Sequence, residues 1–369
     1  MRITSIQLTD FRNYARAELR PCEGITVLYG NNAQGKTALL ESVVLSCTGR
    51  SHRTPRDREL IRWGQEAGRV LIRAERRDGS HEVEMLLSQQ KRKTVKVNGR
   101  ALQRTGELMG HVSGVLFAPE DLRTVKDGPA ERRRFIDMEL SQIRPAYYYA
   151  LQRYAHALLQ RNKLLRDIPL NPALRDTLPD WDAQLARHGA EIMRMRAAFV
   201  RDISEAAHEN HLEISGGLED LRVKYVPSLD AGEDDPARAL AGALAVARET
   251  DIRRGTTTMG PHRDDLTLTL SGMDVRVYGS QGQQRTTALS LKLAELDIMR
   301  RELGEPPVLM LDDVMSELDP KRRRHLLRRL EGIQTIVTCT DLSDLAEAEI
   351  GAAWRIHGGE ISAEGGDEA

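Results

Sequence analysis

The sequence predicts an α/β fold that a helical insertion divides into two parts. A strand at 25–29 leads into a glycine-containing loop and a helical stretch at 36–47. Late in the chain, an apolar strand at 307–312 ends in acidic residues. Between these segments, 129–254 are mostly helical in pattern, so strand-rich segments flank a helical one.

The N-terminal part predicts an antiparallel sheet. Residues 2–9 alternate between apolar and polar side chains, as a half-buried strand does. Further alternating runs lie at 69–76, 82–87 and 94–97. The turn-forming sequences Arg77-Asp78-Gly79-Ser80 and Val97-Asn98-Gly99-Arg100 separate these runs, which is typical of strands joined by hairpins.

The middle of the chain predicts a compact helical arm. Ala, Leu, Arg and Glu become frequent after Gly128-Pro129. Helices are expected at 129–166, 179–211 and 236–254. Prolines between 169 and 179 separate the first two, and the interruptions exclude a long continuous coiled coil. Residues 212–226 are either a short strand or a connector, and 230–236 are a polar turn.

Strand character returns after the helical arm. Strands are expected at 266–270, 274–278, 307–312, 334–339 and 354–357, with helices at 283–303 and 320–330. We therefore expect 1–128 and 256–369 to form one domain that is split in sequence, and 129–255 to form the arm, or lid, domain. The end of the chain, 364–369, is predicted to be a short disordered acidic tail.

Composition excludes several classes of protein. Fifty-four basic and 55 acidic residues give a net charge of −1, so any nucleic-acid binding must come from local clusters. Aromatic residues are only 4%, which argues against a stacking-rich RNA-binding sheet. No apolar run approaches the roughly 20 residues that span a membrane, and the alternating N-terminus is no signal peptide. Scattered Cys22, Cys47 and Cys339 predict reduced thiols and a cytoplasmic location.

The loop after the strand at 25–29 matches the phosphate-binding pattern G-x-x-x-x-G-K-[ST] in full, in its required place between a strand and a helix. Gly30 and Gly35 permit close backbone approach to phosphate oxygens, Lys36 reaches the β- and γ-phosphates, and Thr37 binds magnesium. The pattern predicts an ATP and magnesium site made by Gly30, Asn31, Asn32, Ala33, Gln34, Gly35, Lys36 and Thr37.

The acids at the end of the apolar strand are the expected partners of this loop. We expect Asp312 to bind magnesium, directly or through water, and Asp313 to orient or deprotonate the attacking water. The alternative is a pair of solvated acids at a strand end. Burial of 308–311 argues against that alternative, because it would place this strand beside the strand of the phosphate loop.

A polar segment at a strand-to-helix junction predicts a second anion receptor. A hydroxyl, a glycine and the first amides of a helix can together bind a phosphate. The phosphate loop of the chain already binds that chain's nucleotide. The second receptor is therefore expected to meet the γ-phosphate of a nucleotide held by another molecule. The alternative is an ordinary polar helix cap. The segment consists of Ser280, Gln281, Gly282, Gln283 and Gln284.

Together with Ser316-Glu317-Leu318-Asp319, these motifs resemble the ABC-type ATPase head, and the helical insertion resembles its SMC-like branch. Further motifs resemble the RecF family over nearly the whole chain: 8–14 (LTDFRNY), 29–37 (YGNNAQGKT), 49–53 (GRSHR), 117–122 (FAPEDL), 128–129 with 132–137 (RRRFID), 260–266 (GPHRDDL) and 278–285 (YGSQGQQR). The resemblance implies an ABC-type P-loop ATPase head with an antiparallel β subdomain and an inserted helical arm.

The resemblance also implies a function. RecF proteins are ATP-dependent homodimers that bind double-stranded and gapped or single-stranded DNA in recombinational repair and replication restart. They help to load recombinase with RecO and RecR, and their weak, DNA-stimulated ATPase acts as a switch.

The resemblance assigns roles to further residues. Arg12 and Asn13 match positions near the nucleotide, and Glu120 falls where related heads carry a glutamine. Thr338 or Thr340 stands where transporters have a switch histidine. Related ATPases more often have glutamate at the position of Asp313, so the shorter side chain implies slow hydrolysis.

Basic clusters are the candidate DNA contacts. Lysine and arginine that bind backbone phosphates give sequence-independent, salt-sensitive affinity. The clusters ranked first are Arg50, Arg53 and Arg56, with the neighbouring His52 and Arg58, and Lys91, Arg92 and Lys93. Arg132–Arg134 and Lys321–Arg324 rank lower, and the alternative for each cluster is a solvated face. A further alternative for Arg132–Arg134 is pairing with acids such as Asp137 inside the fold.

Other functions fit the sequence less well. A transporter-coupled ATPase subunit is disfavoured by the helical insertion and the absent switch histidine. A metabolic kinase gives no reason for the Ser280 segment or for the split site. A DNA scaffold that binds ATP without hydrolysing it stays open.

Overall fold

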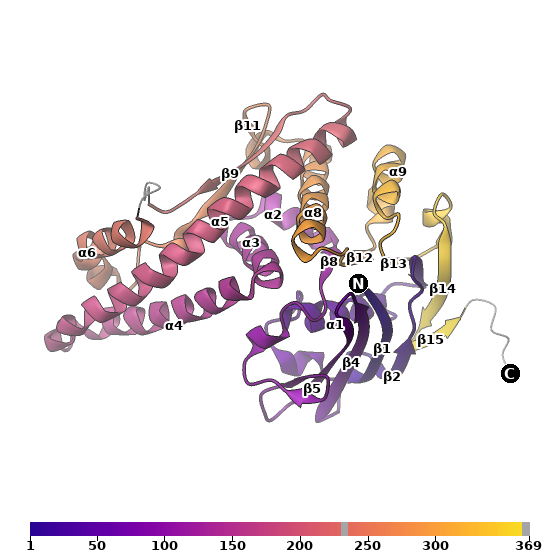
Figure 1. The fold of residues 1–369 in the computed structure, drawn as a ribbon, viewed down its shortest axis with the longest axis horizontal. Helices are drawn as coiled ribbons and strands as arrows, with labels where there is room; N and C mark the ends of the chain where they lie inside the picture. Colours follow the sequence, from indigo (N-terminus) through magenta and orange to yellow (C-terminus); the bar gives the residue numbers. More distant parts are fainter. Residues whose placement is uncertain (230–234, 364–369) are drawn as a thin grey trace. The chain divides into compact units, whose positions relative to one another are not determined.

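The chain folds into two compact units in the computed structural model, which describes residues 1–229 and 235–363 (Figure 1). The head unit comprises Met1–Asp121 and Glu295–Ala369, and the arm unit comprises Leu122–Ala294. Most of the polar turn predicted at 230–236, and the whole of the acidic tail predicted at 364–369, lie outside the described residues.

The chain divides differently from the sequence expectation, because residues 256–294 group with the arm unit. Strand β10 (Asp265–Leu270) pairs antiparallel along its whole length with β9 (Leu221–Val226). The guanidinium of Arg132 also binds both carboxylate oxygens of Asp265, at 2.6 and 2.9 Å. The segment that returns from the insertion is therefore bonded into the insertion itself.

A mainly parallel sheet forms one layer of the head unit. Its strand order is β15-β14-β3-β13-β12-β8, and only β15 runs antiparallel to its neighbour. Every residue of β12 and β13 is buried, as expected for central strands. The strands are β3 (Ile25–Tyr29), β8 (Gly114–Phe117), β12 (Val308–Asp312), β13 (Thr335–Cys339), β14 (Ile350–His357) and β15 (Glu360–Ala363).

One sequence expectation about this sheet was wrong. The acid-ending strand β12 does not lie beside the phosphate-loop strand β3, because β13 is hydrogen-bonded between them. Parallel strands joined by crossovers need not be neighbours in the order in which they appear in the sequence. The carboxyl ends of all three strands still meet at one edge of the sheet.

The predicted antiparallel sheet is confirmed, with the strand order β2-β1-β4-β5-β6-β7. Its strands are β1 (Arg2–Phe11), β2 (Tyr14–Leu19), β4 (Ala67–Arg76), β5 (Gly79–Ser88), β6 (Thr94–Val97) and β7 (Arg100–Ala101). Helix α1 (Lys36–Thr48) contacts strands of both sheets and is buried on nearly every residue. Burial on nearly all sides fits a helix that lies between two layers.

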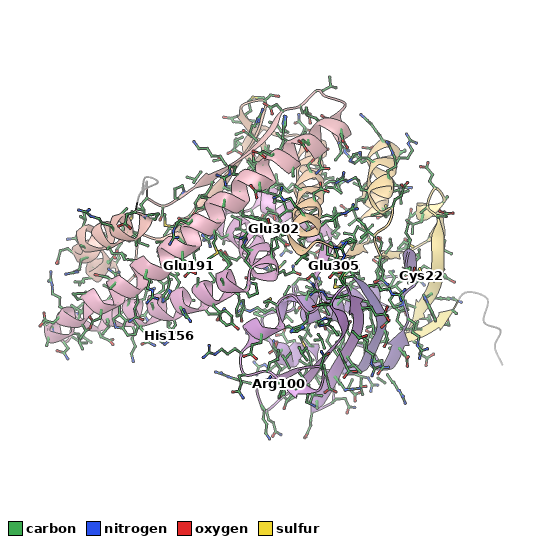
Figure 2. All side chains as sticks on the ribbon, viewed as in Figure 1. Cys22, Arg100, His156, Glu191, Glu302 and Glu305 are labelled. Atoms are coloured by element: carbon green, nitrogen blue, oxygen red, sulfur yellow. The ribbon has the colours of Figure 1, made fainter. Side chains whose placement is uncertain are left out.

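Polar contacts tie the two sequence segments of the head unit together; Glu305 and Cys22, two of the residues involved, are labelled in Figure 2. The buried carboxylate of Glu305 lies 3.1 Å from the N-terminal ammonium and 2.8 Å from the Arg76 guanidinium. The side-chain amide of Gln334 donates to the carbonyls of Ile3 and Cys22, at 2.9 and 2.8 Å. These contacts hold the N-terminal strand against the C-terminal segment that supplies β12 and β13.

The arm unit consists of helices around a three-stranded sheet, β11-β10-β9, in which β11 is Met273–Asp274. The long helices α4 and α5 pack side by side (Figure 1). The helices are α2 (Leu122–Lys126), α3 (Pro129–Ile143), α4 (Pro145–Asp167), α5 (Leu178–Ser215), α6 (Pro236–Arg254) and α7 (Val275–Tyr278). Helix α8 (Gln281–Leu303) starts in the arm unit and ends in the head unit, which also contains α9 (Pro320–Arg329).

Two element predictions in the arm were wrong for local reasons. The helix expected over 129–166 is interrupted at Arg144, whose backbone is extended because Pro145 follows it. The strand expected over 274–278 is mostly the helical turn α7. The Asp274 carboxylate caps that turn by accepting from the backbone N–H groups of Arg276 and Val277.

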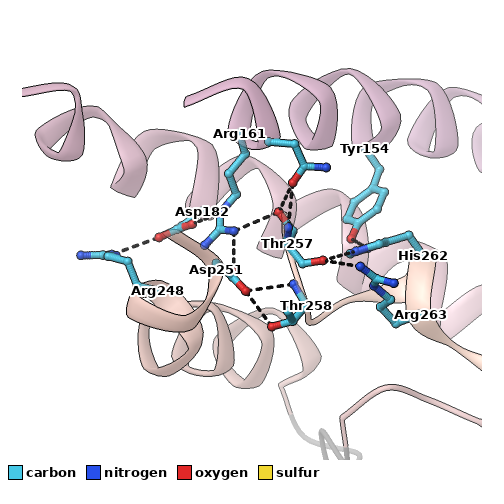
Figure 3. Close-up of polar contacts among 10 residues, drawn as sticks. Tyr154, Arg161, Asp182, Arg248, Asp251, Thr257, Thr258, His262 and Arg263 are labelled. Atoms are coloured by element: carbon cyan, nitrogen blue, oxygen red, sulfur yellow. Dashed lines mark hydrogen bonds and ion pairs between the residues drawn. The ribbon is translucent and has the colours of Figure 1, made fainter. Parts of the chain in front are cut away.

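A buried ionic network holds the arm helices together (Figure 3). The fully buried guanidinium of Arg161 on α4 donates to Asp182 of α5 at 2.6 Å and to Asp251 of α6 at 2.7 Å. It also donates to the Thr257 hydroxyl at 2.9 Å, in the segment that follows α6. Nearby, the Tyr154 hydroxyl is 2.7 Å from Nδ1 of His262. Buried charges need such partners, so the network selects one packing of these elements.

Candidate nucleotide-binding site

The phosphate loop between β3 and α1 adopts a backbone that requires its two glycines. Gly30 and Gly35 have φ angles of 143° and 122°, which side chains rarely allow. A Cβ at Gly35 would also lie 2.6 Å from the Asn13 amide nitrogen and from the Tyr14 hydroxyl, and one at Gly30 would meet the Ile356 carbonyl oxygen. The surrounding structure therefore leaves room for glycine alone at both positions.

The N-terminus of α1 is available to an anion. No side chain caps this helix at Gly35, so its first backbone N–H groups have no side-chain acceptor. The ammonium of the buried Lys36 turns back onto the loop and donates to the carbonyls of Gly30 and Asn31, the latter at 3.0 Å. Burial lowers the pKa of Lys36, while Asp313 and Asp312 act in the opposite direction.

The predicted magnesium ligands lie together although they are far apart in sequence. The Thr37 hydroxyl donates to the Asp312 carboxylate at 2.9 Å, and the Thr338 hydroxyl of β13 donates to the same oxygen at 2.8 Å. Burial raises the pKa of Asp312, while the two hydroxyl donors act against it. A hydroxyl beside a carboxylate is the oxygen donor set that Mg²⁺ prefers, so these residues fit the ion.

Asp313 follows on the same strand end with a φ angle of 55°. Its backbone N–H donates to the Thr338 hydroxyl at 2.9 Å, and its backbone carbonyl accepts from the Ser316 hydroxyl at 3.0 Å. Thr338 thus positions both acids. The sequence had placed Thr338 or Thr340 only at the position of the transporters' switch histidine, without a contact to the acids. Glu120 acts on Asp312 electrostatically, raising its pKa.

These residues open into one pocket of about 1170 Å³. The predicted residues that line this pocket are Arg12, Asn13, Asn32–Thr37, Asp312 and Asp313. Gly30 and Asn31 do not line it; their backbone carbonyls accept hydrogen bonds from the Lys36 ammonium. Sequence reasoning missed the remaining wall, which includes Ile61, Arg62, Trp63, Gln65 and Gln89. No motif marks that wall, because it is assembled from the loop before β4 and the end of β5.

The C-terminal hairpin braces the phosphate loop. The backbone N–H of Gly358 donates to the Gln34 side-chain oxygen at 2.7 Å, and that of Gly359 donates to the Gln34 carbonyl at 3.2 Å. The Asn13 amide donates to the same carbonyl at 2.6 Å. Asn13 and the β14–β15 turn therefore hold the phosphate loop in place through hydrogen bonds to Gln34. This role accounts for their positions without a contact to the nucleotide.

Arg12 also has a supporting position. Its guanidinium binds both carboxylate oxygens of the fully buried Glu41 on α1, at 2.8 and 2.6 Å, and donates to the Glu59 carbonyl at 2.8 Å. The Ser51 hydroxyl donates to Glu41 as well. Burial favours the neutral acid, but the hydrogen bonds from Arg12 and Ser51 outweigh it and hold the pKa of Glu41 below its usual value.

Glu41→Gln is expected to lower the stability of the head unit by about 2 kcal/mol at neutral pH, because Arg12 keeps its charge and loses its partner. The pKa of Glu41 is lower in the folded protein than in the unfolded chain. The ionised Glu41 therefore stabilises the fold at a pH above the ordinary carboxylate pKa, and this stabilisation is lost as the pH falls through the folded-state pKa. The melting temperatures of wild type and variant should therefore converge only as the pH falls through the depressed folded-state pKa of Glu41. Calorimetry with the exposed Glu66→Gln as control checks this, and a constant difference across pH would contradict it.

The second predicted receptor lies in the arm unit at the start of α8. The Ser280 hydroxyl accepts from the backbone N–H of Gln283 at 3.2 Å, and the Gln283 side chain accepts from the Ser280 N–H at 2.8 Å. This is a capping box, so the helix-cap alternative describes the structure of the segment. Ser280 is nevertheless exposed, and a hydroxyl that accepts a hydrogen bond can still donate one.

The two basic clusters ranked first come together in the head unit. The Lys93 ammonium pairs with Asp57 at 2.8 Å, and the Gln89 amide donates to the Arg58 carbonyl at 3.3 Å. Lys91 and Arg92 are exposed beside these contacts. Arg53, by contrast, lines the nucleotide pocket, 3.9 Å from Glu41. We call residues 50–58 and 89–93 the basic loops.

The fold and the site define an ATPase head of the ABC type, in the branch whose two halves flank a helical insertion. The model of the RecF/RecN/SMC N-terminal domain matches residues 2–355. The chain belongs to the RecF family. The DNA replication and repair protein RecF of Agathobacter rectalis is 44% identical, with 94% of each chain covered. RecF of Bacillus mycoides is 44% identical, with 97% of this chain and 96% of the relative covered.

Solved structures also resemble this chain. A structure of the recombination mediator protein RecF with ATP, described as part of the RecFOR pathway, superimposes with a TM-score of 0.92 at 36% identity, covering 98% of this chain and 97% of that chain. The SMC head domain of Pyrococcus furiosus shares the fold, with a TM-score of 0.57 at 16% identity, covering 98% of this chain and 95% of that chain. Among the described residues, none of the helices combines the length and apolarity needed to cross a membrane.

Proposed function

We propose that this protein is an ATP-dependent DNA-binding protein of recombinational repair and replication restart. ATP joins two copies into a dimer on DNA, and slow hydrolysis releases them. The observation that carries the proposal is the 2.9 Å hydrogen bond from Thr37 to Asp312, which unites the phosphate loop with the acid-ending strand in one pocket. Membership of the RecF family supports it.

The residues of the pocket divide the work of an ATPase. Lys36, Thr37 and the N-terminus of α1 would hold the triphosphate, and Thr37 and Asp312 would hold Mg²⁺. Bound Mg²⁺ neutralises charge on the phosphate oxygens. Asp313 would orient a water and take its proton, and its position on the lining of the same pocket supports this role. Its carboxylate is one methylene shorter than glutamate, which supports a slow switch over a fast metabolic enzyme.

A second copy would complete the site through Ser280. The exposed cap of α8 is flanked by apolar side chains that are also exposed, with Met273 at 60%, Val277 at 65% and Tyr278 at 70%. Exposed apolar groups beside a polar anchor are typical of a surface that is covered on association. We therefore place the ATP-dependent homodimer contact at this segment.

DNA would bind to the basic loops of the head unit through its phosphates, in duplex, gapped or single-stranded form. RecF with ATP is described as part of the RecFOR pathway, which supports RecO and RecR as partners in loading recombinase.

Light scattering and ATP turnover test the proposal. The wild type should be a monomer without nucleotide and a dimer with Mg²⁺ and ATP, and gapped DNA should raise its low turnover. Lys36→Met should neither form the ATP-dependent dimer nor show turnover that gapped DNA raises. A protein that stays monomeric with ATP and DNA would contradict the switch. Turnover that is absent both with and without gapped DNA would instead favour a scaffold that binds ATP without hydrolysing it.

Replacing Lys91 and Arg92 with glutamate is expected to weaken binding to duplex DNA at least about tenfold near physiological salt, because phosphate contacts supply most of the affinity. The slope of log affinity against log salt should fall by about two, roughly one for each lost contact. Fluorescence anisotropy over a salt series measures both quantities.

The matched control replaces Arg16, on the edge strand β2, and Arg20, which follows that strand, with glutamate; both side chains are exposed. It makes the same change in net charge. Equal loss of affinity in the two variants would show that overall charge, and not the basic loops, governs DNA binding.

A further inference from the structure

Trp63 stands on the wall of the nucleotide pocket with its side chain almost entirely in solvent. It is 98% exposed, whereas the other tryptophans, Trp181 and Trp354, are partly buried. Aromatic residues make up only 4% of the chain. A fully exposed tryptophan forgoes the large apolar burial that this side chain normally gains, so its position calls for a ligand.

The backbone holds Trp63 rigidly in this place. The Gln65 N–H donates to the Arg62 carbonyl at 3.0 Å, and Gly64 has a φ angle of 82°, which together form a type II turn with Trp63 at its second position. The Arg62 N–H donates to the Asp10 carbonyl at 2.9 Å, and the Arg62 guanidinium lies 3.4 Å from the Asp10 carboxylate. The turn is thus bonded to the antiparallel sheet, and the indole is displayed on a fixed support.

The pocket has chemically different walls. The phosphate loop, Lys36, Thr37 and Asp312 suit a triphosphate with its cation. Trp63, Gly64 and the apolar Ile61 line the same pocket and carry no charge to attract a phosphate, although Arg58 and Arg62 also line it. A nucleotide has this same division, with an anionic chain at one end and a flat, uncharged base at the other. An indole stacks on any base at a free-energy gain that alanine substitution measures readily.

We propose that Trp63 is the base-stacking residue of this nucleotide site. The inference rests on the proposed ATP function and adds the residue that recognises the base. The indole contributes affinity for ATP through the face of its adenine. Because every base has such a face, Trp63 strengthens binding of nucleotides in general and does not by itself select adenine.

Calorimetric titrations of ATP and of inorganic tripolyphosphate, both with Mg²⁺, test the proposal. Trp63→Ala should weaken ATP binding on the order of tenfold. It should change tripolyphosphate affinity by less than about twofold, as surface substitutions usually do. Trp63→Phe should keep most of the ATP affinity. Leu218→Ala, which truncates another highly exposed apolar side chain, should change neither.

A second readout follows the indole directly. In the background Trp181→Phe with Trp354→Phe, Trp63 is the sole tryptophan, and its emission should be quenched by ATP but not by tripolyphosphate. Circular dichroism verifies that each variant is folded.

Several results would overturn the inference. Equal losses for ATP and tripolyphosphate would show that Trp63 only shapes the pocket. Unchanged ATP affinity with weakened DNA binding would show that the indole stacks on DNA bases instead. If the wild type binds ATP and Trp63→Ala binds it equally well, this inference alone fails. If the wild type does not bind ATP, the proposed function fails as well.

Discussion

Lys36→Arg is expected to slow ATP hydrolysis at least about a hundredfold, while ATP affinity falls less than about tenfold. The lysine ammonium is buried and reaches back to the carbonyls of the phosphate loop, so its position is set by a tight fit. Arginine keeps the positive charge that binds phosphate, but its longer, planar group cannot occupy the same point. Stabilisation of the transition state of hydrolysis depends strongly on the exact position of this charge, whereas ATP binding depends on it less.

Single-turnover hydrolysis and calorimetric ATP titration measure the two quantities separately. Lys36→Met is the matched control, because it keeps an unbranched side chain, shorter by one atom, and removes the charge. It should weaken binding and hydrolysis together. Equal and complete loss of both activities in Lys36→Arg would contradict a division between binding and chemistry at this residue.

Ser280→Arg is expected to abolish the ATP-dependent dimer, with association weakened at least about a hundredfold, while the monomer still binds ATP. Ser280 belongs to the arm unit, whereas every residue that lines the nucleotide pocket belongs to the head unit. The bulky side chain would obstruct the cap of α8 where a partner's nucleotide is expected to meet it. Since Ser280 is exposed, losing its cap should cost only about 1 kcal/mol of stability.

Sedimentation velocity with and without ATP measures the association, and calorimetry measures nucleotide binding to the monomer. Ser280→Thr is the conservative control, because threonine retains the hydroxyl and caps a helix nearly as well, and it should still form the dimer. A normal ATP-dependent dimer in Ser280→Arg would remove this segment from the proposed interface.

The phosphate loop could be predicted residue by residue because its chemistry is local. A strand, two glycines, a lysine and a threonine within one turn specify both backbone and ligand. Alternation likewise predicted the antiparallel sheet. The predictions that were wrong depended on a proline that interrupts a helix, on one capping contact or on strand order. Asp274 turned an expected strand into a helical turn, and β13 came between β3 and β12.

Long-range side-chain partners could not be assigned from sequence. Arg12 was predicted near the nucleotide and lines the pocket, but its bidentate partner is Glu41, a glutamate in a helix pattern that gave no sign of complete burial. Trp63 lies in a segment with no recognised pattern, and only the folded wall of the pocket brings it near the phosphate loop.

The sequence by itself determined the family and the fold class of this protein, because the phosphate loop and the acid-ending strand are short patterns whose residues lie close together in the chain. The role of the Ser280 segment stays a proposal, since the same residues also form a helix cap. Only the tertiary structure decided how those patterns combine. Thr37, Asp312 and Thr338 meet because three parallel strands end at one edge of a sheet. The segment after the insertion joins the arm because β10 pairs with β9. Such contacts depend on the packing of distant segments, which local side-chain patterns do not encode.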